Sequence, residues 1–229
     1  MNNIINKTVE KYNMLSDGDR VLVACSGGAD SMLMLNYFLT VKDKYSLDII
    51  VAHVEHGIRG KDSCDDAKFV KRFCEENGVV YHQLSIDAVN ESKLYGMGVE
   101  AYSRKRRYAF FDSIDCDKIA TAHNLNDNIE TALFRLARGT GLKGVCAIPP
   151  VRGKIIRPLL ECSSQAIREY CSINHIPYRV DCTNSDNAYS RNYIRNILIP
   201  SFENVNSDFI SNMSAFISAA AEDSDFIEQ

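Results

Sequence analysis

The residues best suited to chemistry form one hexapeptide, Ser26-Gly27-Gly28-Ala29-Asp30-Ser31. It follows an apolar run and opens an amphipathic stretch, so the pattern predicts a strand, a tight glycine turn and the start of a helix. Adjacent glycines let the backbone turn sharply and approach a phosphate closely, while the amides and the positive dipole end of the helix point to the same place. With the hydroxyl groups of Ser26 and Ser31 as further donors, this segment predicts an anion site.

Asp30 adds a feature that two other common phosphate loops lack. A Walker A loop carries a lysine and a dinucleotide fingerprint carries three spaced glycines, and neither pattern fits this segment. A carboxylate beside a phosphate is repulsive unless a divalent cation bridges the two, so Asp30 predicts bound Mg²⁺. The alternative is an ordinary strand-to-helix turn that is rich in small residues.

A second polar segment, 122–131, follows another apolar run. Asn124 suits a helix N-cap, and His123 and Asp127 are four residues apart, so both could face a nucleotide. His123 could donate to a phosphate oxygen or shuttle a proton, and Asp127 could share Mg²⁺ with Asp30 or accept a proton from an attacking amine. The alternative is structural, with His123 bonded to backbone at the strand end and Asp127 stabilising the helix dipole.

The charge balance favours a local rather than a global contact with nucleic acid. A formal net charge of −4 gives no overall attraction to RNA, so an RNA partner needs a basic patch. One such patch is Arg104-Lys105-Arg106-Arg107, within a predicted helix over 99–114. Arg104 and Arg107 are three residues apart and share a face of that helix. The alternative for this charge run is a solvated helix face.

The elements that must position these residues predict an α/β fold with a doubly wound parallel sheet. Strands are expected over 20–25, 47–54, 79–86 and 117–122, and helices over 4–15, 30–43, 62–77, 99–115 and 125–138. In such βαβ folds ligands bind beyond the carboxyl ends of the strands, where the strand order reverses. After Pro149-Pro150 we expect a short strand near Ile155, a helix over 163–174, a strand over 178–180 and a helix over 190–198.

Composition and cysteine spacing narrow the class of protein. A chain of 229 residues, 45% hydrophobic and 24% charged, can bury one sizeable core with a smaller appendage. No apolar stretch reaches the length of a membrane span and the N-terminus lacks a secretory signal, so a cytoplasmic protein with no membrane partner is expected. The eight cysteines include no Cys-X-X-Cys pair and are expected to be reduced and mostly buried.

The hexapeptide matches the Ser-Gly-Gly-X-Asp-Ser loop of the N-type ATP pyrophosphatases, and residues 18–200 resemble one family of that superfamily, the tRNA(Ile)-lysidine synthetases. The matching segments are His53 to Gly60, the acidic helix start at Asp62, Asp65 and Asp66, then Glu100, Arg104, Arg107 and Tyr108, Ala122 to Thr131, Arg138 to Gly144, Ile148 to Pro150, Arg157 to Leu160, and Arg191, Asn192 and Arg195. The chain departs from the family pattern at Asn124, Asn126 and Asn128, where histidine, aspartate and glutamine are usual or common.

The resemblance implies an adenine nucleotide alpha hydrolase-like, Rossmann-like fold and a specific reaction. With ATP and Mg²⁺ the enzyme adenylates the C2 oxygen of the wobble cytidine in an isoleucine tRNA with anticodon CAU, and the ε-amine of free L-lysine displaces AMP. The implied ATP-binding residues are Ser26, Gly27, Gly28, Ala29, Asp30, Ser31 and His53, with Asp30 as the metal ligand. The implied catalytic residues are Asp30, Arg104, His123 and Asp127, and the implied substrate contacts are Arg104, Arg107, Asp127, Glu130, Gly139, Gly141 and Arg195. Arg195 has an alternative role in a domain-closing ion pair.

Residues 1–200 are expected to form the catalytic domain, and residues 201–229 a long amphipathic helix that begins a linker to an absent domain. The apolar stripe of this helix predicts packing on such a domain or on a second copy, as a homodimer. Two alternative functions stay open. A tRNA thiolase of the same superfamily is disfavoured by the absence of Cys-X-X-Cys, and a non-catalytic ATP-binding module is disfavoured by the presence of Asp30, His123 and Asp127.

Overall fold

Six strands form one sheet with the order β3-β2-β1-β4-β6-β5 in the computed structural model, which describes residues 1–57, 61–180 and 190–228. The strands are β1 (Arg20–Ala24), β2 (Asp48–Glu55), β3 (Val80–Ser85), β4 (Lys118–Ala120), β5 (Val151–Arg152) and β6 (Ile155–Ile156). The pairs β1–β2, β1–β4, β2–β3 and β4–β6 are parallel, and β5 runs antiparallel to β6. The predicted α/β class with a largely parallel sheet is confirmed.

Helices connect these strands and extend beyond them. They are α1 (Asn2–Lys11), α2 (Ala29–Val41), α3 (Lys61–Glu76), α4 (Ala88–Leu94), α5 (Val99–Asp112), α6 (Leu125–Ala137), α7 (Leu142–Val145), α8 (Ser164–Ile173), α9 (Ser190–Tyr193), α10 (Ile199–Val205) and α11 (Phe209–Glu228). A π-helix, Ile194–Leu198, joins α9 to α10. None of the helices in the described parts of the chain is long and apolar enough to cross a membrane.

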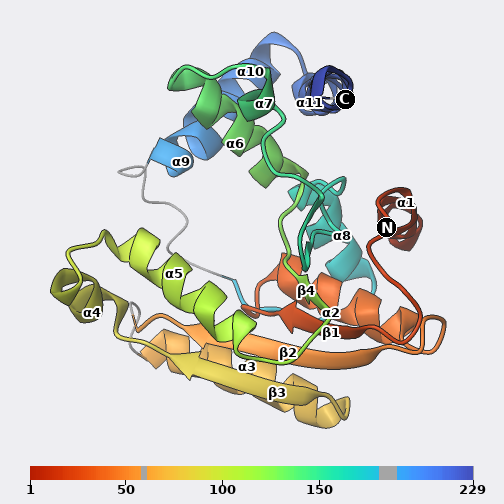
Figure 1. The fold of residues 1–229 in the computed structure, drawn as a ribbon, viewed down its shortest axis with the longest axis vertical. Helices are drawn as coiled ribbons and strands as arrows, with labels where there is room; N and C mark the ends of the chain where they lie inside the picture. The colour runs from red at the N-terminus through yellow and green to blue at the C-terminus, as the bar shows by residue number, and fades with distance from the viewer. Residues whose placement is uncertain (58–60, 181–189, 229) are drawn as a thin grey trace.

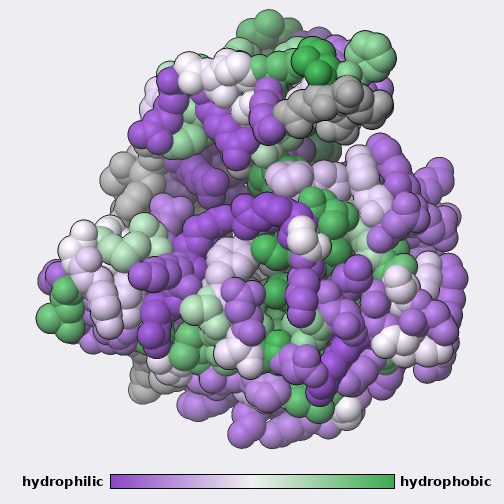
Figure 2. Space-filling model, in the orientation of Figure 1, coloured by the Kyte–Doolittle hydropathy of each residue, from purple (hydrophilic) through white to green (hydrophobic). Residues whose placement is uncertain are grey.

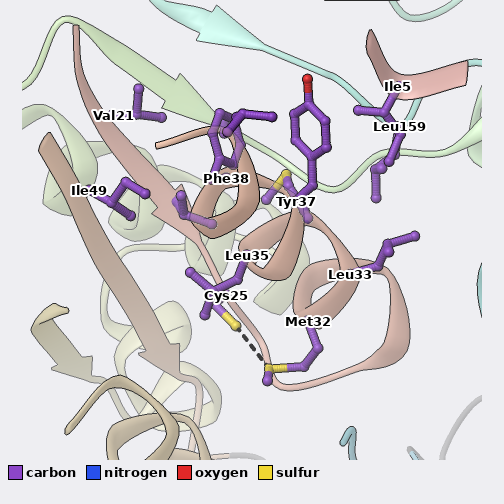
Figure 3. Packing of buried hydrophobic residues seen from close by; sticks show 14 of the residues in the cluster. Ile5, Val21, Cys25, Met32, Leu33, Leu35, Tyr37, Phe38, Ile49 and Leu159 are labelled. Carbon is purple, nitrogen blue, oxygen red and sulfur yellow. Dashed lines mark hydrogen bonds between the residues drawn. The ribbon is translucent and has the colours of Figure 1, made fainter. Parts of the chain in front are cut away.

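Alternation along β1 places the hydrophobic cores on both faces of the sheet. Val21 packs with α1, α2, α3 and α8, whereas its neighbour Leu22 points to the opposite face and packs with α5. Helix α2 is buried on nearly all sides, and its Tyr37 and Phe38 rings meet edge to face with centroids 5.6 Å apart. Figure 3 shows these rings between β1 and Ile5 of α1. The helix that starts at the glycine loop is therefore held firmly.

A third cluster lies outside the sheet. Helix α6 leaves the sheet after β4, and α7, α9, α10 and α11 gather around it (Figure 1); we call these five helices the helical group. Ile129 and Ala132 of α6 pack there against Ile194, Ile199 and Ile217. Figure 2 shows hydrophilic residues around the hollow between the helical group and α5.

The strand order reverses at β1. The chain passes from β1 outward to β2 and β3, then returns to place β4 on the other side of β1. The carboxyl ends of β1 and β4 are therefore neighbours, and the segments that follow them flank the switch point where α/β sheets bind ligands.

The strand predicted over 178–180 is wrong. The sheet has no strand from this segment, which the structure describes as irregular up to residue 180. Instead, the N–H of Arg179 donates to the carbonyl of Gly27 at 2.9 Å, and its guanidinium pairs with Asp66 at 3.0 Å. The segment therefore packs beside the glycine loop and joins no strand of the sheet.

Two helix predictions near the C-terminus need correction. The segment 190–198 is not one α-helix, since it widens into a π-helix just before Pro200, which has no N–H to donate to the carbonyl four residues back. The single helix expected over 201–229 is two helices. Asn206 breaks it with an extended backbone, and its Oδ1 accepts the N–H of Asp208 at 2.9 Å.

Helix α4 was not expected, although its Asp87 accepts the N–H of Asn90 at 3.1 Å and Glu91 accepts the N–H of Asp87 at 2.9 Å, a capping arrangement. The expectation of reduced, buried cysteines is confirmed for a set within the described residues, while Cys182 lies outside them. The set is Cys25, Cys74, Cys116, Cys162 and Cys171.

Candidate active site

The glycine loop connects Cys25, after β1, to the start of α2. Its organiser is Ser31, whose Oγ accepts the N–H groups of Ser26 at 3.2 Å and Gly27 at 3.1 Å and donates to the carbonyl of Gly28 at 3.0 Å. Two loop amides thus bond to Ser31, which leaves the first-turn amides of α2 as the donors for an anion. The predicted strand, turn and helix start are confirmed, with Gly28 at the N-cap.

Gly27 is the loop residue least tolerant of a side chain. Its φ is +91°, and a Cβ there would lie 3.2 Å from Cγ2 of Val70. We expect Gly27→Ala to lower the free energy of unfolding by about 1–2 kcal/mol through backbone strain, and to weaken ATP binding by shifting the loop. Gly18→Ala is the matched control. Its φ of +81° brings the same backbone strain, but a Cβ there meets no atom within 4 Å, so it should lose similar stability and keep ATP binding. Urea unfolding and ATP titration of both variants test this, and wild-type ATP affinity in Gly27→Ala would contradict it.

Asn124 joins the glycine loop to the start of α6. Its Nδ2 donates to Oδ1 of Asp30 at 3.1 Å, and its Oδ1 accepts the N–H of Asp127 at 3.0 Å. Oδ2 of Asp127 accepts the N–H of Asn124 at 3.0 Å, which completes a capping box. The predicted N-cap is confirmed, and Asp127 has the structural role given as its alternative. Asparagine at 124, where the resembled family usually has histidine, still supplies a donor to Asp30.

Arg195 holds two carboxylates of α6. Its Nε and Nη2 lie 2.6 and 3.0 Å from the carboxylate oxygens of Glu130, and Nη2 also lies 3.2 Å from Oδ1 of Asp127. The ion pair given as its alternative is therefore present and joins the π-helix to α6. Burial raises the pKa of both Glu130 and Asp127, against the lowering effect of Arg195. The site thus presents two oriented carboxylates with increased proton affinity.

Asp30 fits a magnesium ion that arrives with a nucleotide. Burial raises the pKa of Asp30, and a bound cation would oppose that effect. Among the described residues, no group of three His, Cys, Asp or Glu side chains could hold a metal by itself. Mg²⁺ usually takes one or two protein carboxylates and completes its coordination with phosphate oxygens and water. One carboxylate at the phosphate loop is consistent with that pattern.

His123 is neutral at physiological pH. Its Nδ1 lies 3.0 Å from Oγ1 of Thr121, just beyond β4. Burial is the largest cause that lowers the pKa of His123, to about 3, and four positive charges add to it: Arg157, Arg107, Arg104 and Arg191. A neutral imidazole can donate an N–H hydrogen bond to an oxyanion, but it carries no additional proton to transfer. The environment therefore favours donation to a phosphate over proton shuttling.

The low pKa of His123 makes stability depend on pH. The unfolded chain protonates this histidine near pH 6.5, whereas the folded chain does so only near pH 3. Between these values the unfolded state binds more protons, so the free energy of unfolding decreases as the pH falls. We expect the wild type to lose more stability between pH 7 and pH 5 than His123→Gln, measured by urea unfolding. An NMR titration that gives His123 a pKa near 6.5 would contradict this.

Guanidinium groups from separate elements surround His123. In α5, the guanidinium carbons of Arg104 and Arg107 lie 5.2 and 5.7 Å from the ring centroid of Tyr108. Arg157, after β6, is 3% exposed and has a buried Nε without a protein hydrogen-bond partner. Burial lowers the pKa of Arg107 and Arg157. An unsatisfied buried donor within a cationic cluster is suited to a phosphate oxygen.

The remaining predicted site residues either support the glycine loop or lie beyond the end of α6. His53 is 3% exposed, and its Nδ1 lies 2.9 Å from the Cys25 carbonyl, so it supports the strand end that carries the loop. Gly139, with φ +78°, and Gly141, the N-cap of α7, lie beyond the end of α6. Residues 58–60 of the segment that resembles the family lie outside the described residues.

Two curated relatives of similar sequence have the same name. The tRNA(Ile)-lysidine synthase of Clostridium tetani is 41% identical over 217 residues, which cover 92% of this chain and 46% of that protein. The tRNA(Ile)-lysidine synthase of Thermosipho africanus is 40% identical over 224 residues, which cover 96% of this chain and 52% of that protein. The chain therefore spans about half the length of these curated relatives.

The U34-tRNA thiolase of Methanococcus maripaludis, solved with its 4Fe-4S cluster, has a TM-score of 0.74 at 18% identity and covers 96% of this chain and 78% of that one. At this identity the likeness shows the fold alone. The model of the PP-loop domain matches residues 1–202. Because this match covers most of the sequence, the chain belongs to the PP-loop domain family.

Proposed function

We propose that this chain uses ATP to join L-lysine to C2 of the wobble cytidine in an isoleucine tRNA with anticodon CAU. Its similarity to tRNA(Ile)-lysidine synthases supports the substrate pair. The observation that carries the proposal is the pair of hydrogen bonds made by the Asn124 side chain. They join Asp30 of the phosphate loop to Asp127 of α6 in one site. A nucleotide at the loop and an amine at the carboxylates of α6 would meet at the switch point of the sheet.

In the first step, the C2 oxygen of the cytidine attacks the α-phosphorus of ATP, and the bond from that phosphorus to pyrophosphate breaks. The first-turn amides of α2 would hold the leaving pyrophosphate, and Arg104 and Arg107 would face the charge on the α-phosphate. Neutral His123 would donate an N–H to a phosphate oxygen. Mg²⁺ bound at Asp30 would neutralise further phosphate charge.

In the second step, the ε-ammonium group of lysine gives a proton to Asp127, and the neutral amine then attacks C2. The bond from C2 to its oxygen breaks, and AMP leaves. The raised pKa of Asp127 makes it a better base than an exposed aspartate. Arg195 keeps Asp127 and Glu130 in one orientation, and both negative charges would attract the ammonium group of the incoming lysine.

A thiolase reaction has less support from this chain. Cys25 lies beside the loop, but burial raises the pKa of its thiol to about 11, which makes it a poor nucleophile. Its sulfur contacts Oγ of Ser31 and the sulfur of Met32, and Figure 3 shows the latter contact within the core.

The domain division and the homodimer are further parts of the proposal. We propose that residues 1–200 form the catalytic unit and that α11 contacts a second copy. Ile217 of α11 is buried against α6, whereas Phe216, Phe226 and Ile227 are exposed and supply the apolar surface for this contact. Sedimentation over a range of concentrations tests it, and a monomer at all concentrations would contradict it.

Release of AMP and pyrophosphate from Mg-ATP tests the reaction, with tRNA and lysine omitted in turn. We expect AMP formation to require the CAU-anticodon tRNA. ATP binding without tRNA-dependent AMP formation would support the alternative of a non-catalytic ATP-binding module.

A further inference from the structure

A cavity of about 350 Å³ runs along α6 from Thr131 to Arg138, just past the end of the helix. It is lined by Thr131, Phe134, Arg135, Arg138, Gly139, Thr140 and Arg191. Three of these described lining residues are arginines and none is acidic. The cavity is therefore strongly cationic in a chain whose formal net charge is −4.

Ion pairs do not neutralise these arginines within the described parts of the chain. Nη1 of Arg135 donates to the carbonyls of Gly144 and Ala147 at 3.1 and 2.9 Å, which fixes the direction of its guanidinium. The guanidinium carbon of Arg138 lies 4.8 Å from the ring centroid of Phe134. Guanidinium groups that form no ion pair among the described residues are suited to an oxyanion ligand, which they can bind through two parallel hydrogen bonds.

A second cavity, with a volume of about 210 Å³, lies between α3 and Pro177 and differs from the first in its charge. Its single arginine, Arg72, pairs with Glu76 on the same helix at 2.8 Å. The charge of that arginine is already matched, so this second cavity does not call for an anion.

The cationic cavity adjoins the candidate active site. Oγ1 of Thr131 donates to the backbone carbonyl of Asp127 at 2.8 Å, one helical turn away. The charge of Arg191 lowers the pKa of His123 and opposes the raised pKa of Glu130, so Arg191 lies within electrostatic reach of both. Arg138 follows the last residue of α6, about 16 Å along the helix axis from Asp127. That distance excludes the reacting atoms but suits a neighbouring part of a long substrate.

We propose that this cavity binds a backbone phosphate of the RNA substrate, outside the nucleotide that reacts. The proposal rests on the proposed function, which supplies the RNA. The guanidinium groups of Arg138 and Arg191 would contact the phosphate, and the open space beside Gly139, where a Cβ would meet no atom within 4 Å, leaves room for its sugar. A free amino acid fits less well, because its ammonium group would lie among guanidinium groups with no carboxylate in the lining.

Salt dependence of tRNA binding tests this site. The affinity of the chain for the CAU-anticodon tRNA is measured between 50 and 200 mM salt, with Arg138→Gln and Arg191→Gln as variants. For each we expect affinity about tenfold lower, and a slope of log affinity against log salt that is smaller by about 0.7–0.9. Arg138→Lys should keep the slope and lose affinity only about threefold, because lysine keeps the charge without the planar fork. Arg72→Gln is the control and should change neither quantity.

Wild-type slope and affinity in both glutamine variants would overturn the inference. Unchanged tRNA binding with a raised KM for lysine would also overturn it, and would assign the cavity to the amino acid. AMP formation separates this inference from the proposed function. A wild type that forms AMP with tRNA, while its variants bind tRNA normally, would remove only the phosphate site. A wild type that neither binds tRNA nor forms AMP would remove both.

Discussion

Replacing Asp127 with asparagine is expected to reduce lysine transfer about 10²- to 10⁴-fold, the usual contribution of a general base. Adenylation of the tRNA should continue, because this step needs no proton acceptor and the phosphate loop is unchanged. The variant should keep its fold, since Glu130 retains both of its contacts with Arg195. Pyrophosphate release in a single turnover and labelled lysine in the tRNA, measured together, separate the two steps.

Asp87→Asn is the matched control for this variant. Asp87 is also a carboxylate at a helix start, where it caps α4, and asparagine can accept the same N–H group. We expect both steps of the reaction to proceed normally in this control. Wild-type lysine transfer in Asp127→Asn would show that another group, or water, receives the proton.

Replacing Asp30 with asparagine is expected to reduce the first step by at least about 100-fold, because a metal ion contributes several kcal/mol to stabilising charge in such a transition state. Asparagine can still accept the hydrogen bond from Asn124, so the loop should keep its shape. The loss should be partly reversed by higher Mg²⁺ concentration. Pyrophosphate release over a range of Mg²⁺ concentrations measures this effect.

Asp43→Asn is the control at the opposite end of α2, where the side chain is exposed. This variant also removes one carboxylate charge beside α2, but far from the phosphate loop. It should therefore leave the magnesium dependence unchanged. If Asp30→Asn showed the wild-type magnesium dependence, Asp30 would not be the metal ligand.

The sheet and the glycine loop were predictable because their signals are local. Apolar runs that alternate with amphipathic stretches predict a parallel sheet, and the hexapeptide with two glycines predicts the turn at the end of β1. The proximity of Asp30 and Asp127 followed from the rule for strand ends, without any contact being known. The structure adds that the side chain of Asn124 joins them.

Other parts of the candidate site depend on packing that the sequence does not show. Nothing in the segment around Arg157 indicates that its guanidinium is buried beside His123, since these residues come from separate strands. Arg191 lines a cavity with residues of α6 that are far away in sequence. The interrupted C-terminal helix depended on one side chain, because Asn206 bonds to the N–H two residues ahead and ends α10.

Incorporation of labelled lysine into a CAU-anticodon isoleucine tRNA, with this chain and Mg-ATP, tests the central claim most directly. We expect label in the tRNA only when ATP is present, and no label when the wobble cytidine is replaced by uridine. Cleavage of ATP in the presence of tRNA and lysine, without label in the tRNA, would contradict the account.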